Sequence, residues 1–292
     1  MEIVLWLRSF STAALDGVLG YITELGSTMF YLAAVPIIYW CIDRTSGYIV
    51  GLTVLSGGIC TDLAKAAISA PRPFELDLNV KPSPHFLETA TGSGMPSGHA
   101  FNSMAFWMAS SLRCRRAWFY FLSAALVLLI GFTRVYSGVH FPLQVLWGWA
   151  GGITAAVLVA AVTGFAQRRM KGGLESLALA IAGSVLLLYA FVPALSSTTM
   201  EDYVGLIGIA GGMSLGYYLH MKLVGSSARG PFLSQLIKLM IGFVGFLGLR
   251  YLVDLVAETD PAFYLPLYFI LGLWPTFIST ALFKALKLEK RG

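Results

Sequence analysis

The chain has 292 residues, of which 57% are hydrophobic and only 12% are charged. Soluble globular proteins carry about 25% charged residues, so this composition excludes an ordinary soluble protein and predicts an all-α integral membrane protein. The net charge of +5 does not indicate a nucleic-acid partner, because the basic residues fall in short clusters between apolar segments, as in proteins that cross a membrane.

Residues 1–20 are predicted to form an amphipathic helix on the membrane surface, because Arg8 and Asp16 stand among apolar side chains. A bilayer core requires about 20 mostly apolar residues per helix. By that criterion the chain contains nine predicted spans, at residues 25–42, 46–66, 97–112, 118–137, 142–165, 174–194, 203–220, 234–256 and 263–284. We therefore expect an amphipathic segment at 1–22, a core with the chemical motifs at 23–170 and four additional spans at 171–292.

The basic residues predict the orientation of the spans, because Lys and Arg are retained on the cytoplasmic side. Most of the 20 Lys and Arg residues fall in connections on one side, including the cluster at 113–116 and the segment that begins at Lys284. The exceptions, which lie toward the opposite side, are Arg8, Lys65, Arg72, Lys81, Arg134 and Arg250. This distribution predicts an outside N-terminus and a cytoplasmic C-terminus.

Three segments place polar residues at the outer ends of predicted spans. The first contains Lys65, at the end of the second span, and Arg72, which stands between two prolines that favour an extended backbone. Taken alone, this segment is better explained by a lysine that reaches the interface and by a Pro-Arg-Pro sequence that ends a helix.

The second segment, from Gly94 to His99, opens the third span. Ser97 is a typical N-cap residue, and Gly98 permits a ligand to approach the backbone closely. Free N–H groups and the positive end of the helix dipole would then face an anion. The alternative is an ordinary capped helix, but capping does not explain a histidine in the first turn beside a glycine.

The third segment runs from Thr133 to Gln144. Arg134 lies near the outer end of the fourth span, where a charge close to hydrocarbon is costly and indicates a functional site. The alternative is that Arg134 pairs with a lipid phosphate or with a carbonyl at the end of a helix. His140 precedes the fifth span, and Gln144, four residues later, falls on the same face of a helical turn.

All three segments are predicted to converge on one active-site pocket among the outer ends of spans two to five. The pocket would hold three cations, a helix N-terminus and two imidazoles. This set matches phosphoryl transfer, which requires positive charge on the equatorial oxygens, a nucleophile and an acid for the leaving group. The sequence contains no metal-binding cluster, and we expect no cofactor.

These segments resemble the motifs of the type 2 phosphatidic acid phosphatase superfamily, which also includes vanadium haloperoxidases. The family motifs are Lys-x6-Arg-Pro, Pro-Ser-Gly-His and Ser-Arg-x5-His-x3-Asp. The segments similar to them are Lys65 to Pro73, Pro96 to His99 and Thr133 to Gln144. The resemblance covers the part of the chain from about residue 60 to 145 and implies a membrane-embedded phosphatase that uses no metal ion.

The family resemblance also implies a role for each matching residue. His140 would be the nucleophile that forms a phosphohistidine, and His99 would protonate the leaving oxygen and later help to activate water. The residues that would hold the phosphate oxygens are Lys65, Arg72, Arg134 and the backbone around Ser97 and Gly98.

Two positions depart from the family pattern. Thr133 replaces a serine and keeps the hydroxyl. Gln144 replaces an aspartate that orients the nucleophilic histidine; its carbonyl accepts the same Nδ1–H bond without adding charge, so we expect a less basic nucleophile. The glucose-6-phosphatase branch also carries glutamine here, in a similar His-Phe-Pro-x-Gln sequence, and is similar in having nine spans and a cytoplasmic C-terminus.

The substrate implied by the family is a lipid phosphate or lipid diphosphate, whose headgroup can enter a pocket at the interface while its tail stays in the bilayer. A soluble sugar phosphate is the first alternative, which Gln144 and the nine spans favour. The second alternative is a transporter or scaffold with a decayed phosphate site. The intramembrane charges that transport would use are Glu24, Asp62, Arg250 and Asp254. Transfer of the phosphate to an acceptor other than water, and the oligomeric state, stay open.

Overall fold

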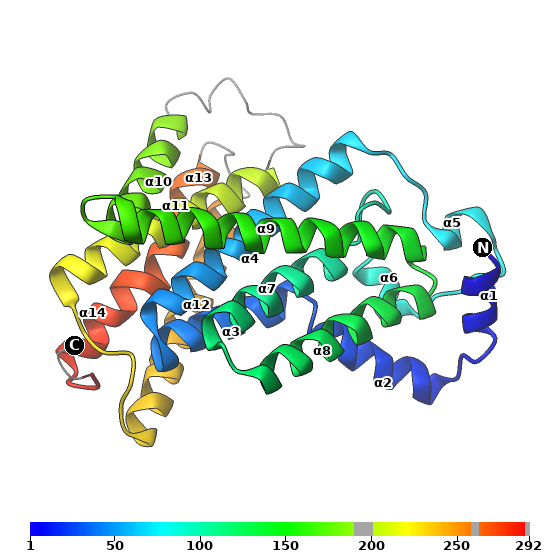
Figure 1. Cartoon of the computed structure of the whole chain (residues 1–292), viewed down its shortest axis with the longest axis horizontal. Helices are drawn as coiled ribbons and strands as arrows, with labels where there is room; N and C mark the ends of the chain where they lie inside the picture. The colour runs from blue at the N-terminus through cyan, green and yellow to red at the C-terminus, as the bar shows by residue number, and fades with distance from the viewer. Residues whose placement is uncertain (190–200, 258–262, 290–292) are drawn as a thin grey trace. The chain divides into compact units, whose positions relative to one another are not determined.

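A computed structural model describes residues 1–189, 201–257 and 263–289 of the chain. These residues form helices joined mostly by short connections, and no β-strand occurs among them (Figure 1). The prediction of an all-α protein is confirmed for this part of the chain. Contacts divide the chain into two compact units, Met1–Ala33 with Ser56–Val159 and Ala34–Leu55 with residues 160–292.

The first unit contains all the predicted motifs. In chain order its helices are α1 (Glu2–Arg8), α2 (Ala13–Glu24), the start of α3 (Thr28–Ile37), the second part of α4 (Arg44–Ala67), α5 (Pro73–Leu76), α6 (Pro84–Glu88), α7 (Gly98–Cys114), α8 (Ala117–Tyr136) and the first part of α9 (Pro142–Arg169). Helices α7 and α8 pack against each other, and α1 and α2 both contact α8.

The second unit contains the remaining parts of α3, α4 and α9. Its other elements are η1 (Ile38–Ile42), α10 (Gly173–Tyr189), α11 (Glu201–Leu219), η4 (His220–Val224), α12 (Phe232–Ala257), α13 (Tyr264–Leu273), η6 (Trp274–Ile278) and α14 (Ser279–Ala285), where η denotes a π-helix. Within this unit the buried carboxylate of Glu289 pairs with Arg44 and, at 3.2 Å, with Lys238. The paired charges compensate one another, as buried charges require.

Among the described residues, six helices are long and apolar enough to cross a bilayer: Arg44–Ala67, Ala117–Tyr136, Pro142–Arg169, Val204–Val224, Phe232–Val253 and Tyr264–Ala285. The prediction of a multi-pass membrane protein is therefore confirmed. The other predicted spans coincide with shorter helices at Thr28–Ile42, Gly173–Val185 and α7, so the number nine stays a prediction. The end of the span predicted at 174–194 lies outside the described residues.

The N-terminal segment forms two helices, so the prediction of one helix over residues 1–20 is wrong. Helices α1 and α2 are bent by 116° relative to each other. The hydroxyl of Ser9 donates to the carbonyl of Trp6 at 2.6 Å, and Thr12 caps α2 by accepting from the N–H of Leu15 at 3.2 Å. Hydroxyl side chains compete in this way for backbone hydrogen bonds, which ends the first helix and starts the second.

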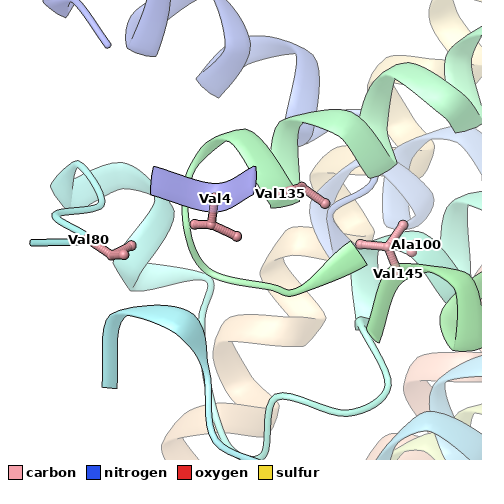
Figure 2. Close-up of a cluster of buried hydrophobic side chains, with 5 residues drawn as sticks. All are labelled: Val4, Val80, Ala100, Val135 and Val145. Carbon is pink, nitrogen blue, oxygen red and sulfur yellow. The ribbon is translucent and has the colours of Figure 1, made fainter. Parts of the chain in front are cut away.

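A small cluster of buried apolar side chains connects the elements that carry the motifs. Figure 2 shows Val4 of α1 beside Val80, with Val135 of α8 nearby and Ala100 of α7 next to Val145 of α9. Three of these residues each directly follow a motif residue in the chain. The motif residues that precede them are His99, Arg134 and Gln144. Packing of the apolar residues therefore fixes the backbone positions of the adjacent motif residues.

Glycines of α9 allow it to lie directly on α7. A Cβ atom at Gly148 would be 2.7 Å from the carbonyl oxygen of Ser97, and one at Gly152 would be 2.5 Å from that of Phe101. Both separations are too short for any side chain. The small residues thus bring the first turn of α9, which contains Gln144, against the N-terminus of α7.

Candidate active site

His140 lies in the connection between α8 and α9, and its side chain is buried with only 2% of the residue exposed. Its Nδ1 atom is 2.9 Å from the carbonyl oxygen of Gly94 and 3.1 Å from Oε1 of Gln144. Because both partners are acceptors, Nδ1 carries the proton and Nε2 presents its lone pair. That Nε2 atom lies 3.2 Å from Nη1 of Arg72, so the nucleophilic position of the imidazole faces a cation.

The amide of Gln144 is fixed at both ends. Its Oε1 accepts from the backbone N–H of Phe141 at 3.1 Å as well as from His140, and its Nε2 donates to the carbonyl of Pro71 at 2.9 Å. An aspartate, the family residue, is shorter and has no N–H for the Pro71 carbonyl. Glutamine therefore joins the third motif to the first, in addition to orienting the imidazole.

Arg72 is 1% exposed, and its backbone N–H donates to Oε2 of Glu75 at the start of α5. Its guanidinium donates to four carbonyl oxygens, which belong to Thr91, Gly92, Ser93 and Val139. These partners are neutral, so the hydrogen bonds that hold the guanidinium in place leave its positive charge available to a bound anion.

Arg134, in the last turn of α8, is completely buried. Its Nη1 donates to the hydroxyl of Thr23 and its Nη2 to the hydroxyl of Thr89, both at 3.1 Å. Its Nε is buried without a hydrogen-bond partner among the described residues. As with Arg72, neutral groups fix the guanidinium, and the Nε–H remains for a ligand.

The N-terminus of α7 borders the same site. Ser97 is the N-cap, as predicted, but its hydroxyl makes no capping bond, while its backbone N–H donates to the carbonyl of Gln144 at 3.1 Å. A Cβ atom at Gly98 would lie 3.9 Å from Nζ of Lys65 and 3.6 Å from the methyl carbon of Thr61. The lysine ammonium therefore lies beside the free N–H groups of the first helical turn.

Several buried polar atoms around these residues lack a hydrogen-bond partner in the described part of the chain. They are Oγ1 of Thr61, Oγ of Ser97, Nε2 of His99 and Nε of Arg134. Buried polar atoms are nearly always hydrogen-bonded, so a group of unpaired atoms beside two arginines and a lysine indicates a site for an anion with several oxygens.

Electrostatic coupling links the two imidazoles to the cations. The charges of Lys65, Arg72 and Arg134 act on both His99 and His140, and the charge of His140 also acts on His99. Burial, together with the charges of Arg134 and Arg72, holds the pKa of His140 well below its usual value near 6.5. The imidazole is therefore neutral at neutral pH, which is the form a nucleophile requires.

The structure thus brings all eight predicted site residues into one compact unit, whereas their chemical roles stay predictions. Sequence reasoning missed Thr23 and Thr89, which hold Arg134, and the carbonyls of Pro71 and Gly94. Threonines and backbone carbonyls carry no distinctive pattern. The only sequence signal for these partners was Arg134 itself, because an arginine near hydrocarbon requires hydrogen-bond partners.

Replacement of Gln144 by glutamate should move the acid limb of kcat/KM to higher pH. In the wild type the low pKa of His140 keeps the imidazole neutral as pH falls through 6.5, so activity is lost only below that value. A carboxylate at Nδ1–H favours the protonated imidazole and raises its pKa. The measurement is kcat/KM between pH 4 and 8, with Gln167→Glu, an exposed glutamine of the same helix, as the control. Superimposable pH profiles for Gln144→Glu and the wild type would contradict the assigned contact.

Comparison with known proteins agrees with this geometry. Residues 46–169 match the family model of the PAP2 superfamily, and residues 204–291 match that of the PAP2 superfamily phosphatase transmembrane extension. The first match contains all eight predicted site residues. The chain belongs to the PAP2 superfamily, the type 2 phosphatidic acid phosphatases.

Three relatives of the chain, one from an animal and two from bacteria, are named for phosphatase activities. Sphingosine-1-phosphate phosphatase 1 of Rattus norvegicus is 29% identical over 216 residues, which cover 69% of this chain and 47% of the relative. Undecaprenyl-diphosphatase BcrC of Bacillus subtilis is 26% identical over 52% of this chain and 74% of its own length. Lipid A 1-phosphatase of Rhizobium etli is 34% identical over 38% of this chain and 47% of its own length. The chain thus spans about half the length of the first of these relatives.

One solved structure is also similar to the chain. It is the crystal structure of a transmembrane PAP2-type phosphatidylglycerolphosphate phosphatase from Bacillus subtilis, with a TM-score of 0.49 and 22% sequence identity. The similarity covers 57% of this chain and 86% of that chain.

Proposed function

We propose that the chain is a phosphatase that hydrolyses a lipid phosphate or lipid diphosphate through a phosphohistidine at His140. The observation that carries this proposal is the position of the unprotonated Nε2 of His140 beside the buried Arg72, which is held by neutral groups, while the charge of the buried Arg134 also acts on the imidazole. A buried nucleophile surrounded by available positive charge fits a phosphoryl group, which bears its negative charge on the non-bridging oxygens.

The substrate phosphate binds between the cations and the start of α7. Arg72, Arg134 and Lys65 neutralise its oxygens, while the hydroxyl of Ser97 and the backbone N–H groups from Gly98 onward donate hydrogen bonds to them. Hydrogen bonds to the protein fix the two guanidinium groups before the substrate arrives. The site therefore does not need to reorganise when charge shifts in the transition state.

Nε2 of His140 then attacks the phosphorus, and the bond from phosphorus to the leaving oxygen breaks. The bound phosphate anion favours the protonated imidazole of His99, which gives its proton to that oxygen, so the alcohol or phosphate product leaves neutralised. The carbonyls of Gly94 and Gln144 accept from Nδ1–H and stabilise the positive charge that forms on the phosphorylated imidazole. Neutral His99 next takes a proton from water as the water oxygen attacks phosphorus. The bond from phosphorus to Nε2 of His140 breaks and its electron pair returns to the imidazole, which releases inorganic phosphate and restores both histidines.

The site opens on the non-cytoplasmic side of a membrane that the chain crosses nine times, with the C-terminus in the cytoplasm. The distribution of Lys and Arg among the connections supports this orientation. The PAP2 core occupies residues 23–170 between the N-terminal segment 1–22 and four further spans at 171–292. The helices found at each predicted span support the number.

A lipid substrate is supported by the relatives, which are named for the phosphates of sphingosine and lipid A and for undecaprenyl diphosphate. A site at the end of apolar helices can bind a headgroup while the hydrocarbon tail stays among lipids. Because Gln144 stands where the family motif has aspartate, a soluble sugar phosphate is the comparison substrate that a test must include.

Purified protein in detergent should release inorganic phosphate from lipid phosphates in the presence of EDTA, and orthovanadate should inhibit the release. The panel comprises phosphatidate, sphingosine 1-phosphate, undecaprenyl diphosphate and glucose 6-phosphate, and kcat/KM is compared across it. We expect a lipid substrate to exceed glucose 6-phosphate by at least about 10²-fold, since remote binding energy contributes to the rate. Preference for glucose 6-phosphate would refute the lipid assignment, and no turnover of any compound would refute the phosphatase assignment.

A further inference from the structure

The N-terminal segment before the PAP2 match reaches the site at two points. Thr23, in the last turn of α2, is completely buried and accepts from Nη1 of Arg134. After the end of α2, a Cβ atom at Gly26 would lie 3.3 Å from Cδ2 of His99. Both residues lie outside the family match, which begins at residue 46. Residues just after the segment predicted to lie on the membrane surface therefore bond Arg134, a proposed phosphate-binding residue, and lie close to His99, the proposed acid.

Helix α2 is fastened in place by polar contacts at both of its ends. Near its start, Asp16 accepts from the hydroxyl of Tyr136 at 2.7 Å and from Arg8 at 3.1 Å. Near its end, Nε2 of His85 lies 3.1 Å from the carbonyl of Gly20. Because Tyr136 is two residues after Arg134 on α8, the contact with Asp16 ties the helix that carries Thr23 to the helix that carries the arginine (Figure 1).

Two threonines define the plane of the Arg134 guanidinium. Thr23 and Thr89 approach different terminal nitrogens, and Thr89 donates its own hydroxyl proton to the carbonyl of Phe86 at 3.1 Å, which leaves its lone pairs for the arginine. A carboxylate at either position would neutralise the arginine and compete with a phosphate. A hydroxyl orients the guanidinium and leaves the charge and the Nε–H for the ligand.

We infer that Thr23 is a positioning residue of the active site, supplied by the segment outside the PAP2 match, and that it orients Arg134 toward the substrate phosphate together with Thr89. This inference rests on the proposed phosphatase function. Thr23 acts through Arg134 and has no bond of its own to the reacting atoms. Its removal therefore weakens the binding of an oxyanion and of the transition state while the cation itself remains.

The test compares Thr23→Val, which keeps the shape but loses the acceptor, with Thr23→Ser, which keeps the acceptor. Thr89→Val removes the other acceptor. Thr53→Val is the control, because Thr53 is buried to the same extent and its hydroxyl donates to the carbonyl of Ile49 in its own helix. For each variant we would measure kcat and KM on the best lipid phosphate, the inhibition constant of orthovanadate and the rise in melting temperature that orthovanadate produces.

Thr23→Val and Thr89→Val should each lower kcat/KM and weaken orthovanadate binding by about tenfold or more, as expected for a lost bond to a charged group. Thr23→Ser and Thr53→Val should stay within about threefold of the wild type, a change that corresponds to less than one such bond. A lower melting temperature with unchanged orthovanadate affinity in Thr23→Val would show a merely structural residue and overturn the inference. If Thr23→Val does not fold, Thr23→Ala and Thr89→Val decide the question by the same measurements.

Failure of the proposed function gives a different result. Wild-type protein that releases phosphate from no substrate would refute the phosphatase assignment, whereas the effect of orthovanadate on the melting temperature requires no turnover. Equal stabilisation of the wild type and of both valine variants by orthovanadate would overturn the role of Thr23 even if the wild type is an active phosphatase.

Discussion

Replacement of His140 by alanine is expected to lower kcat by about 10⁴-fold or more, the scale seen when the nucleophile of a covalent mechanism is removed. The lone pair on Nε2 forms the bond to phosphorus, and Nη1 of Arg72 lies 3.2 Å from that nitrogen. The measurement is phosphate release from the preferred lipid phosphate. A second readout is protein-bound radioactive phosphate after an alkaline quench, which preserves phosphohistidine.

A buried histidine elsewhere in the chain controls for the loss of an imidazole from the protein interior. His220, in the second unit, is 1% exposed and its Nδ1 is 2.9 Å from the hydroxyl of Thr280. His220→Ala should keep kcat within about threefold of the wild type, which is less than the contribution of one hydrogen bond. Labelled phosphate should be present in this variant and absent from His140→Ala. A His140→Ala protein that folds and still turns over at the wild-type rate would remove the proposed mechanism.

Replacement of Arg72 by lysine, although it conserves the charge, is expected to lower kcat/KM by about 10²–10³-fold. The guanidinium contacts Nε2 of His140 and also donates to carbonyls on both sides of the site, including those of Thr91 and Val139. A single ammonium group cannot reproduce this planar set of donors. Because the contacts support the transition state, kcat should fall by a larger factor than KM rises.

Arg116→Lys provides the matched control for this variant, because it makes the same chemical change at an exposed arginine of the same unit. We expect its kcat/KM to equal that of the wild type. Thermal unfolding of both variants separates loss of chemistry from loss of the fold. A fully active Arg72→Lys protein would show that charge alone, without the geometry of the guanidinium, suffices at this position.

The membrane class and the motif residues were predictable because they depend on short stretches of sequence. The apolar segments identify helices wherever they lie in the fold, and Ser97 was predicted as an N-cap from its position before a helical run. His140 and Gln144 are four residues apart, so the contact between them follows from one helical turn. The motif resemblance then identified the family, which the comparisons confirm.

The wrong prediction of a single N-terminal helix has a local cause, and the division into two helices has a long-range consequence. The amphipathic composition predicted one helix over residues 1–20. The hydroxyls of Ser9 and Thr12 divide this segment, and composition alone does not account for their hydrogen bonds. Once divided, the segment can turn so that α2 lies against α8. A surface helix and a helix that contributes Thr23 to the site have the same amphipathic composition, so the pattern does not distinguish them.

By itself, the sequence determined that this is an all-α membrane protein of the PAP2 superfamily, and it predicted which histidines, arginines and lysine would form the site. Only the tertiary structure decided what holds those groups. Thr23 and Arg134 are 111 residues apart, and Pro71 and Gln144 are 73 apart. Such contacts depend on how helices pack, and threonine hydroxyls and backbone carbonyls occur throughout any chain. Whether such a group contributes to the site depends on where packing places it, and a local sequence pattern does not contain that information.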